Sequence, residues 1–242
     1  MTKAIWTLNV DNYAPEITAL TYPLLRQYAD KIGADFNVIK ERKFRSQGFP
    51  YMYEKLQMYE LGRDYDWNIL IDSDALVHPE MFDITDQLSK DTVCFCGLDM
   101  AGIRWRGDNY FRRDGRYLGT CSWFAVASNW CLDLWHPLED MTLDQALDNI
   151  FPKVSEQNSG LCPLTHFMDD YVISRNVARY GLKVTTCDEM FKRLGFPNSF
   201  MWHMYKIPRE DKLAQIREVI SKWGLTEDGK CDPMQHDVVF SA

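Results

Sequence analysis

Short apolar segments alternate with helical patterns over the first third of this 242-residue chain. The apolar runs predict buried strands at residues 3–10, 35–39 and 66–72. A helical pattern that ends at Gly33 predicts a helix that either starts near Tyr22 or kinks at Pro23, and a second pattern covers residues 51–61. Alternation of this kind implies parallel strands with right-handed crossovers. We therefore expect an α/β fold with a Rossmann-like, mostly parallel central sheet flanked by helices.

The remaining two thirds of the chain have a less regular pattern. We expect strands at residues 92–98, 118–127 and 182–186, and helices at residues 129–135, 143–150, 169–180 and 208–223. Residues 99–116 are rich in glycine, arginine and aromatic residues without an apolar period, which predicts a long loop. No repeat, low-complexity tract or linker divides the chain, so a single domain over residues 1–242 is expected.

The composition argues against several classes of protein. Hydrophobic residues make up 46% and charged residues 26%, which is ordinary for a globular chain and not for a disordered one. The net charge is −8 without a basic cluster, so we expect no binding to nucleic acid. No transmembrane segment or signal peptide is expected either. The seven cysteines include no CxxC pair, and Cys94 and Cys96 fit a buried strand better than a zinc site. These features predict a cytoplasmic protein.

The sharpest chemical signal is a pair of aspartates directly after the third predicted strand. Asp72 and Asp74 are two residues apart, so their carboxylates project to the same side of an extended chain. Such a pair can hold one hard divalent cation, which in turn can bridge the phosphates of a nucleotide diphosphate. The alternative is a plain turn, because aspartate and Ser73 both favour turns. The apolar residues on both sides favour the functional interpretation.

Two segments resemble GT-A glycosyltransferases. Residues 51–77, YMYEKLQMYELGRDYDWNILIDSDALV, resemble the segment in which a lysine-bearing helix and an apolar strand lead into the DxD motif. Residues 24–40, LLRQYADKIGADFNVIK, are similar to the step between the first helix and second strand of those enzymes. The galactosyltransferase GMA12/MNN10 group and related viral or bacterial sugar transferases are the nearest in pattern. The resemblance covers about the first third of the chain.

The resemblance implies a metal-dependent sugar transfer by one GT-A domain. The donor would be a nucleotide-diphosphate sugar, most simply a UDP-sugar, and the acceptor a hydroxyl of a glycan or glycoconjugate. The nucleotide-binding part would cover residues 1–100 approximately, and the acceptor part residues 101–242. The family does not fix whether this chain transfers a hexose or a pentose.

The resemblance also assigns binding residues one by one. The metal would be held by Asp72, Asp74 and His203, and the nitrogen ligand favours Mn²⁺ over Mg²⁺. The nucleotide would contact Thr7, Asn9, Tyr13, Lys55, Asp72 and Ser73, with the Tyr13 ring stacked on the base. For His203, which lies among aromatic residues, the alternative is a packed core histidine.

Three further aspartates are candidates for catalysis. Asp169 and Asp170 open a predicted helix and match an acidic step that contacts the donor sugar or acceptor or acts as a base; the alternative is helix capping. Asp99 follows another predicted strand. In an inverting reaction one of them would be the base, and in a retaining one they would stabilise positive charge on the sugar. Arg104, Trp105 and Arg106 lie in the predicted long loop and would fold over the diphosphate or stack on a sugar; the alternative is a solvated, mobile loop.

Two other functions remain open at this stage. A HAD-like phosphatase also has an apolar strand before Asp-x-Asp, but its motif has Thr or Val at the position of Leu76 and usually opens the chain. A non-catalytic sugar- or nucleotide-binding module of the same fold is the second alternative.

Overall fold

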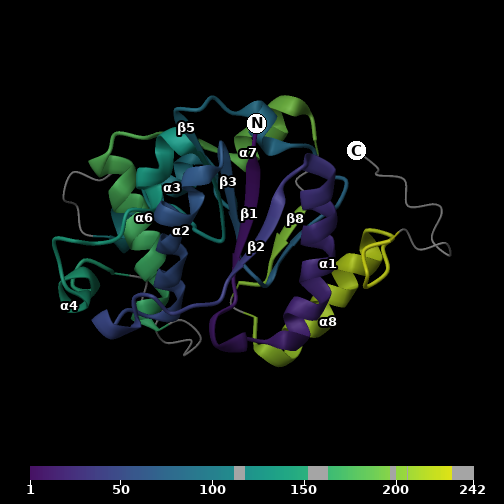
Figure 1. The fold of residues 1–242 in the computed structure, drawn as a ribbon, viewed down its shortest axis with the longest axis horizontal. Helices are drawn as coiled ribbons and strands as arrows, with labels where there is room; N and C mark the ends of the chain where they lie inside the picture. The colour runs from purple at the N-terminus through teal and green to yellow at the C-terminus, as the bar shows by residue number, and fades with distance from the viewer. Residues whose placement is uncertain (112–117, 152–162, 197–199, 206, 231–242) are drawn as a thin grey trace.

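A computed structural model describes residues 1–111, 118–151, 163–196, 200–205 and 207–230 (Figure 1). Its centre is a six-stranded sheet in the order β2-β1-β3-β6-β5-β7. The strands are β1 (Lys3–Leu8), β2 (Asp35–Ile39), β3 (Trp67–Ile71), β5 (Thr92–Phe95), β6 (Phe124–Ser128) and β7 (Lys183–Thr186). Of these, β6 runs antiparallel to both of its neighbours, and the other five run in one direction. The predicted α/β class with a mostly parallel sheet is confirmed.

A second sheet consists of two short strands at the edge of the candidate site. In it, β4 (Ala75–Val77) pairs with β8 (Met201–His203) in antiparallel orientation, and Ala75 lies opposite His203. The sequence pattern does not predict either strand as a separate element. Their pairing joins residues from the first and last thirds of the chain.

Helices cover both faces of the central sheet. They are α1 (Pro15–Ile32), α2 (Met58–Leu61), α3 (Met100–Tyr110), α4 (Leu143–Leu147), α6 (Met168–Arg179), α7 (Cys187–Leu194) and α8 (Arg209–Lys222), and a 3-10 helix over Tyr51–Gln57 leads into α2. Along β1, Ile5 packs with α1 and α7, whereas Trp6 packs with α3 and α6 on the opposite face, as the two-residue repeat of a strand requires. Figure 1 shows α8 beside α1, and apolar residues of both helices form a shared cluster with Leu76.

The helix α3 replaces part of the long loop predicted over residues 99–116. The buried residues of α3 are Ile103, Arg106, Gly107 and Tyr110, which have regular helical spacing. Because two of these four positions are arginine and glycine, the sequence shows no apolar period. Gly107 packs so closely on Leu118 that an added Cβ would lie 2.7 Å from the Leu118 carbonyl carbon.

Other differences concern where elements begin. The first helix begins at Pro15 rather than near Tyr22, because a proline in the first turn needs no hydrogen bond for its nitrogen. It continues through Pro23 to Ile32. The strand expected at residues 118–127 begins only at Phe124. Among the described residues, no helix is both long and apolar enough to cross a membrane.

Candidate functional site

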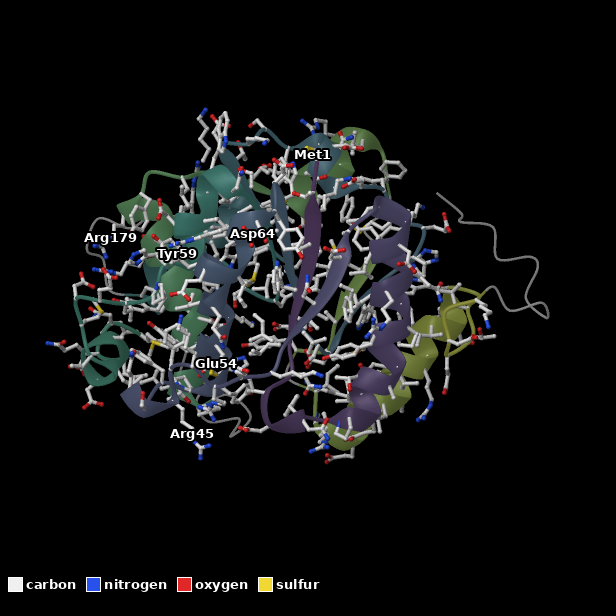
Figure 2. The ribbon with its side chains drawn as sticks, viewed as in Figure 1. Met1, Arg45, Glu54, Tyr59, Asp64 and Arg179 are labelled. Carbon is white, nitrogen blue, oxygen red and sulfur yellow. The ribbon has the colours of Figure 1, made fainter. Side chains whose placement is uncertain are left out.

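A cavity of about 670 Å³ opens where β1, β3 and β5 end. In Figure 2, Met1 marks the end of the molecule where β1 begins, and Arg45 lies at the opposite end, to which the carboxyl ends of the parallel strands point. Open α/β sheets bind ligands at this edge. The polar lining residues include Lys55, Asp72, Ser73, Asp74, Ser122, Asp169, Asp170, His203 and Lys212.

The turn that carries the two aspartates is anchored on two sides. The Asp72 amide donates to the Trp123 carbonyl at 2.8 Å, just before β6. The buried Thr21 hydroxyl of α1 donates to the Ser73 carbonyl at 2.7 Å. The Ala75 amide closes the turn by donating to the Asp72 carbonyl at 3.0 Å. Asp72 and Asp74 therefore lie in a turn, which was the non-functional alternative for this pair. The same turn also places both residues at the cavity.

His203 reaches the same point through the pairing of β4 with β8. Its Nε2 lies 3.6 Å from an Asp74 oxygen and 3.8 Å from an Asp72 oxygen. One ligand atom from each of the three residues lies within 4.8 Å of the other two. The Trp123 ring stacks on the imidazole with centroids 4.9 Å apart and an interplanar angle of 9°. Two carboxylate oxygens and one imidazole nitrogen fit a divalent metal such as Mn²⁺ or Mg²⁺.

Two lysines pair with these aspartates. Lys55 Nζ lies 2.6 Å from Asp72 Oδ1, and Lys212 of α8 forms an ion pair with Asp74 Oδ2. Burial raises the pKa of Asp72 despite the nearby Lys55 charge. Burial would raise the pKa of Asp74 too, but hydrogen bonds and charges from His203 and Lys212 hold it well below its usual value. Asp74 is therefore the more firmly ionised of the two.

Lys55 also connects the first pair of aspartates to the second. Its Nζ lies 2.7 Å from Asp169 Oδ2, and the Ser122 hydroxyl donates to the same oxygen at 2.6 Å. Burial would lower the pKa of Lys55, but the charges of Asp169 and Asp72 raise it above its usual value. Lys55 is therefore a permanently charged bridge.

Asp170 has a different set of partners. Arg106 Nη2 lies 2.6 Å from Asp170 Oδ2, and the Ser122 amide donates to Asp170 Oδ1 at 2.7 Å. Burial would raise the pKa of Asp170, but the Arg106 charge lowers it overall. Arg106 in turn donates to the Thr120 carbonyl. Both Asp169 and Asp170 line the same cavity as Asp72, Asp74 and His203.

The two tyrosines Tyr13 and Tyr51 also line the cavity. Their rings are near-parallel, with centroids 6.1 Å apart and an interplanar angle of 20°. Burial raises the pKa of Tyr51 to about 12, and the charges that act on it include Lys55, Asp72 and Asp169. Tyr51 is therefore a second aromatic residue of the cavity lining, beside Tyr13, which the sequence analysis expects to stack on the base.

Three of the residues expected at the site lie elsewhere. Asp99 caps α3, with its Oδ1 accepting from the Gly102 amide at 2.7 Å, and it is not among the cavity-lining residues. Thr7 is fully buried, and neither it nor Asn9 lines the cavity. The first part of the chain reaches the cavity instead through Leu8, the last residue of β1, and through Val10 and Tyr13 beyond it.

Sequence reasoning missed several lining residues. Lys212 and Arg209 belong to the predicted last helix, whose contact with the aspartates arises only from the packing of α8 on α1. Ser122 was part of a segment that departs from the family pattern. No local signal in the sequence indicates these contacts.

No family model and no curated protein matches this sequence. Solved structures do resemble the fold. The WbbM bifunctional glycosyltransferase is 13% identical with a TM-score of 0.50; the match covers 91% of this chain and half of that one. A glycosyltransferase involved in glycosylating the major capsid of PBCV-1 is 9% identical over 90% of this chain and 100% of its own, with a TM-score of 0.49. A197 from STIV has a TM-score of 0.37 at 13% identity, over 77% of this chain and 81% of that one. The likeness to WbbM shows a shared fold.

Proposed function

We propose that this protein is a metal-dependent glycosyltransferase. The donor is a nucleotide-diphosphate sugar, with UDP-sugars as the first choice, and the sugar is transferred to a hydroxyl of a glycan or glycoconjugate. The supporting observation is the convergence of Asp72, Asp74 and His203 at the carboxyl edge of the sheet, inside a cavity that also contains Asp169 and Asp170. We also propose that the protein is related to the GMA12/MNN10-like group of galactosyltransferases. The transferred sugar is then a hexose or a pentose.

The donor's diphosphate is proposed to lie at the Asp72–Asp74 end. A bound Mn²⁺ or Mg²⁺ would supply the charge that stabilises the departing nucleotide diphosphate. The near-parallel Tyr13 and Tyr51 rings are placed to stack on the base, and Ser73 to contact the nucleotide. The nucleotide-binding part then covers about residues 1–100 and the acceptor part residues 101–242, within one GT-A domain. Mn²⁺ is the first choice because of the imidazole ligand.

Asp169 and Asp170 are proposed to face the reacting sugar. Each of them forms an ion pair with a cation, Asp169 with Lys55 and Asp170 with Arg106. Fixed negative charge at this place stabilises positive charge that develops on the sugar as its bond to the diphosphate breaks. Asp170 is the first choice for this role because its side chain is 13% exposed, whereas the side chain of Asp169 is 4% exposed.

Exposed aromatic residues support a carbohydrate acceptor. Trp105 and Tyr205 line the cavity and are 46% and 39% exposed. Large exposed aromatic rings that line a cavity suit the apolar face of a sugar ring. The five described cysteines are free thiols, which supports a reducing compartment. A cytoplasmic location is part of the proposal.

The test is a panel of sugar nucleotides incubated with Mn²⁺ and read as release of UDP or GDP, with and without acceptor sugars. We expect release from at least one donor, its loss with EDTA, and its loss in Asp74→Ala. Tight binding of a donor without release would favour the non-catalytic module. Release of inorganic phosphate from a phosphate ester, with no nucleotide released from any sugar nucleotide, would favour the phosphatase. Nucleotide release that survives EDTA would contradict metal dependence.

A further inference from the structure

The ion pair between Lys212 and Asp74 puts a cation where a metal would bind. Lys212 lies in the first turns of α8, and its side chain is 13% exposed against 15% for Asp74. The ammonium therefore satisfies a nearly buried carboxylate that also belongs to the metal cluster. Lys212 pairs with one Asp74 oxygen and the imidazole lies nearest the other, so a divalent cation held beside His203 would share this carboxylate with the ammonium. Repulsion between two positive charges on one carboxylate favours movement of the lysine away from the metal.

The geometry of α8 allows this movement without unfolding the helix. Ile216, Val219 and Ile220 fix the helix against α1, and an ion pair between Arg209 and Glu16 joins the beginnings of the two helices. The backbone of α8 is therefore held against α1 both at its first turn and along its apolar face. The flexible four-carbon stem of Lys212 is the part that can swing, and its rotation moves the charge by a few ångströms within the cavity.

Lys55 cannot play the same part. It is 5% exposed and is shared between Asp72 and Asp169 at 2.6 and 2.7 Å. If it left, the nearly buried Asp169 carboxylate and the partly buried Asp72 carboxylate would both lose their partner, which is costly. Lys212 has only Asp74 as an ion-pair partner among the described residues. It is therefore the displaceable cation of the site.

The charge sum shows what must arrive with the metal. Asp72, Asp74 and Asp169 carry three negative charges and Lys55 and Lys212 two positive ones, so the sum is −1 with a neutral imidazole. A divalent cation alone changes the sum to +1 and frees an ammonium beside it. A cation that arrives with the two negative charges of a nucleotide-diphosphate sugar leaves the sum at −1, and the diphosphate gives the freed ammonium a new partner.

We propose that Lys212 is an exchangeable counter-ion, which occupies Asp74 in the empty site and moves to the donor's diphosphate when the divalent cation takes Asp74. The donor therefore enters as its metal complex, and Lys212 opposes binding of the cation alone. This inference rests on the proposed function, because it requires a metal and a diphosphate at the site.

The test measures binding rather than turnover. Free Mn²⁺ is followed by electron paramagnetic resonance, and UDP binding at saturating Mn²⁺ by calorimetry. In Lys212→Gln we expect Mn²⁺ alone to bind about tenfold more tightly, since a competing charge is gone, and UDP with Mn²⁺ to bind about tenfold more weakly. Lys212→Arg keeps the charge and should follow the wild type in both measurements. Lys222→Gln is the matched control, because Lys222 lies on the same helix, is 68% exposed and pairs only with Glu218 among the described residues.

The two affinities are expected to change in opposite directions in Lys212→Gln, so the possible outcomes can be told apart. If Lys212→Gln weakens both affinities or leaves both unchanged, while the wild type binds UDP with Mn²⁺, the exchange is overturned and the proposed function stands. If the wild type binds neither Mn²⁺ nor UDP with Mn²⁺, the proposed function fails as well. Thermal unfolding of each variant shows whether it is folded, and Lys212→Met offers a second neutral side chain of similar length should the glutamine variant not fold.

Discussion

Ala75 in β4 lies directly opposite His203 in β8, and this pairing places an imidazole beside the two aspartates that precede β4. Successive side chains of a strand point to opposite sides, so a neighbouring residue of β8 cannot substitute for His203. The candidate metal site thus depends on the register of a two-stranded sheet.

His203→Ala should weaken Mn²⁺ binding by roughly 10–100-fold, because one of three ligands is lost. The paramagnetic resonance signal of free Mn²⁺ measures this directly. Trp202→Ala is the matched control, since Trp202 is the adjacent residue of β8 and is 49% exposed. Equal effects of the two substitutions would contradict a ligand role for His203.

Asp170→Asn should lower the free energy of unfolding by about 3 kcal/mol at pH 7, because Arg106 then lies nearly buried without its carboxylate partner. The Arg106 charge lowers the folded-state pKa of Asp170, so the carboxylate stabilises the fold above the usual pKa of about 3.9. This stabilisation is lost as the pH falls through the lowered value. The difference between wild type and variant should therefore shrink toward acidic pH in urea titrations.

The control for that titration is Asp140→Asn. Asp140 also pairs with an arginine, Arg175, but its side chain is 45% exposed. Exposed pairs contribute about 0–1 kcal/mol, so a small change is expected. A difference at Asp170 that is equally small, or that does not change with pH, would contradict the account.

Trp105→Ala should raise the acceptor KM about tenfold and leave donor binding unchanged, because this exposed ring lines the cavity from α3 and is proposed to contact the acceptor. The measurement is the acceptor dependence of nucleotide release, with UDP affinity measured separately. Trp130→Ala removes a ring that is 69% exposed and is not among the lining residues. A changed UDP affinity in Trp105→Ala would place the ring at the donor instead.

Gly107→Ala should destabilise the protein by about 1–3 kcal/mol, because the added Cβ would lie 2.7–2.8 Å from the Leu118 backbone. The shift of α3 that relieves this contact should also move Arg106 away from Asp170. Urea unfolding gives the first effect. Arg104→Ala changes a more exposed residue of the same helix and should cost far less. Comparable losses would mean that the glycine contact is not tight.

The sequence predicts those features that depend on residues close together in the chain. The third strand and the turn at Asp72 and Asp74 follow from a local apolar run and a local pair of acids. The helix α3 escapes prediction because Arg106 and Gly107 take two of its buried positions, and each is explained only by a distant partner, Asp170 or the Leu118–Gly119 backbone. His203 entered the candidate site through a family resemblance, whereas its approach to Asp74 is due to strand pairing.

The same limit applies to the cations of the site. Lys55 was expected near the nucleotide, but its division between Asp72 and Asp169 depends on how α6 packs beside the 3-10 helix that precedes α2. Lys212 was not expected at all, because an amphipathic helix pattern does not say which polar residue faces a partner. Asp99 shows the reverse case, since its carboxylate at a strand end caps the following helix and does not line the cavity.

The pairing of β4 with β8 also has a consequence for biosynthesis. Asp72 and Asp74 leave the ribosome long before His203 and Lys212, so the early chain carries two neighbouring carboxylates that lack their later partners. Contacts between segments so far apart in sequence form late in folding. The cluster of Asp72, Asp74, His203 and Lys212 is therefore incomplete in the nascent protein until its last described helix is in place.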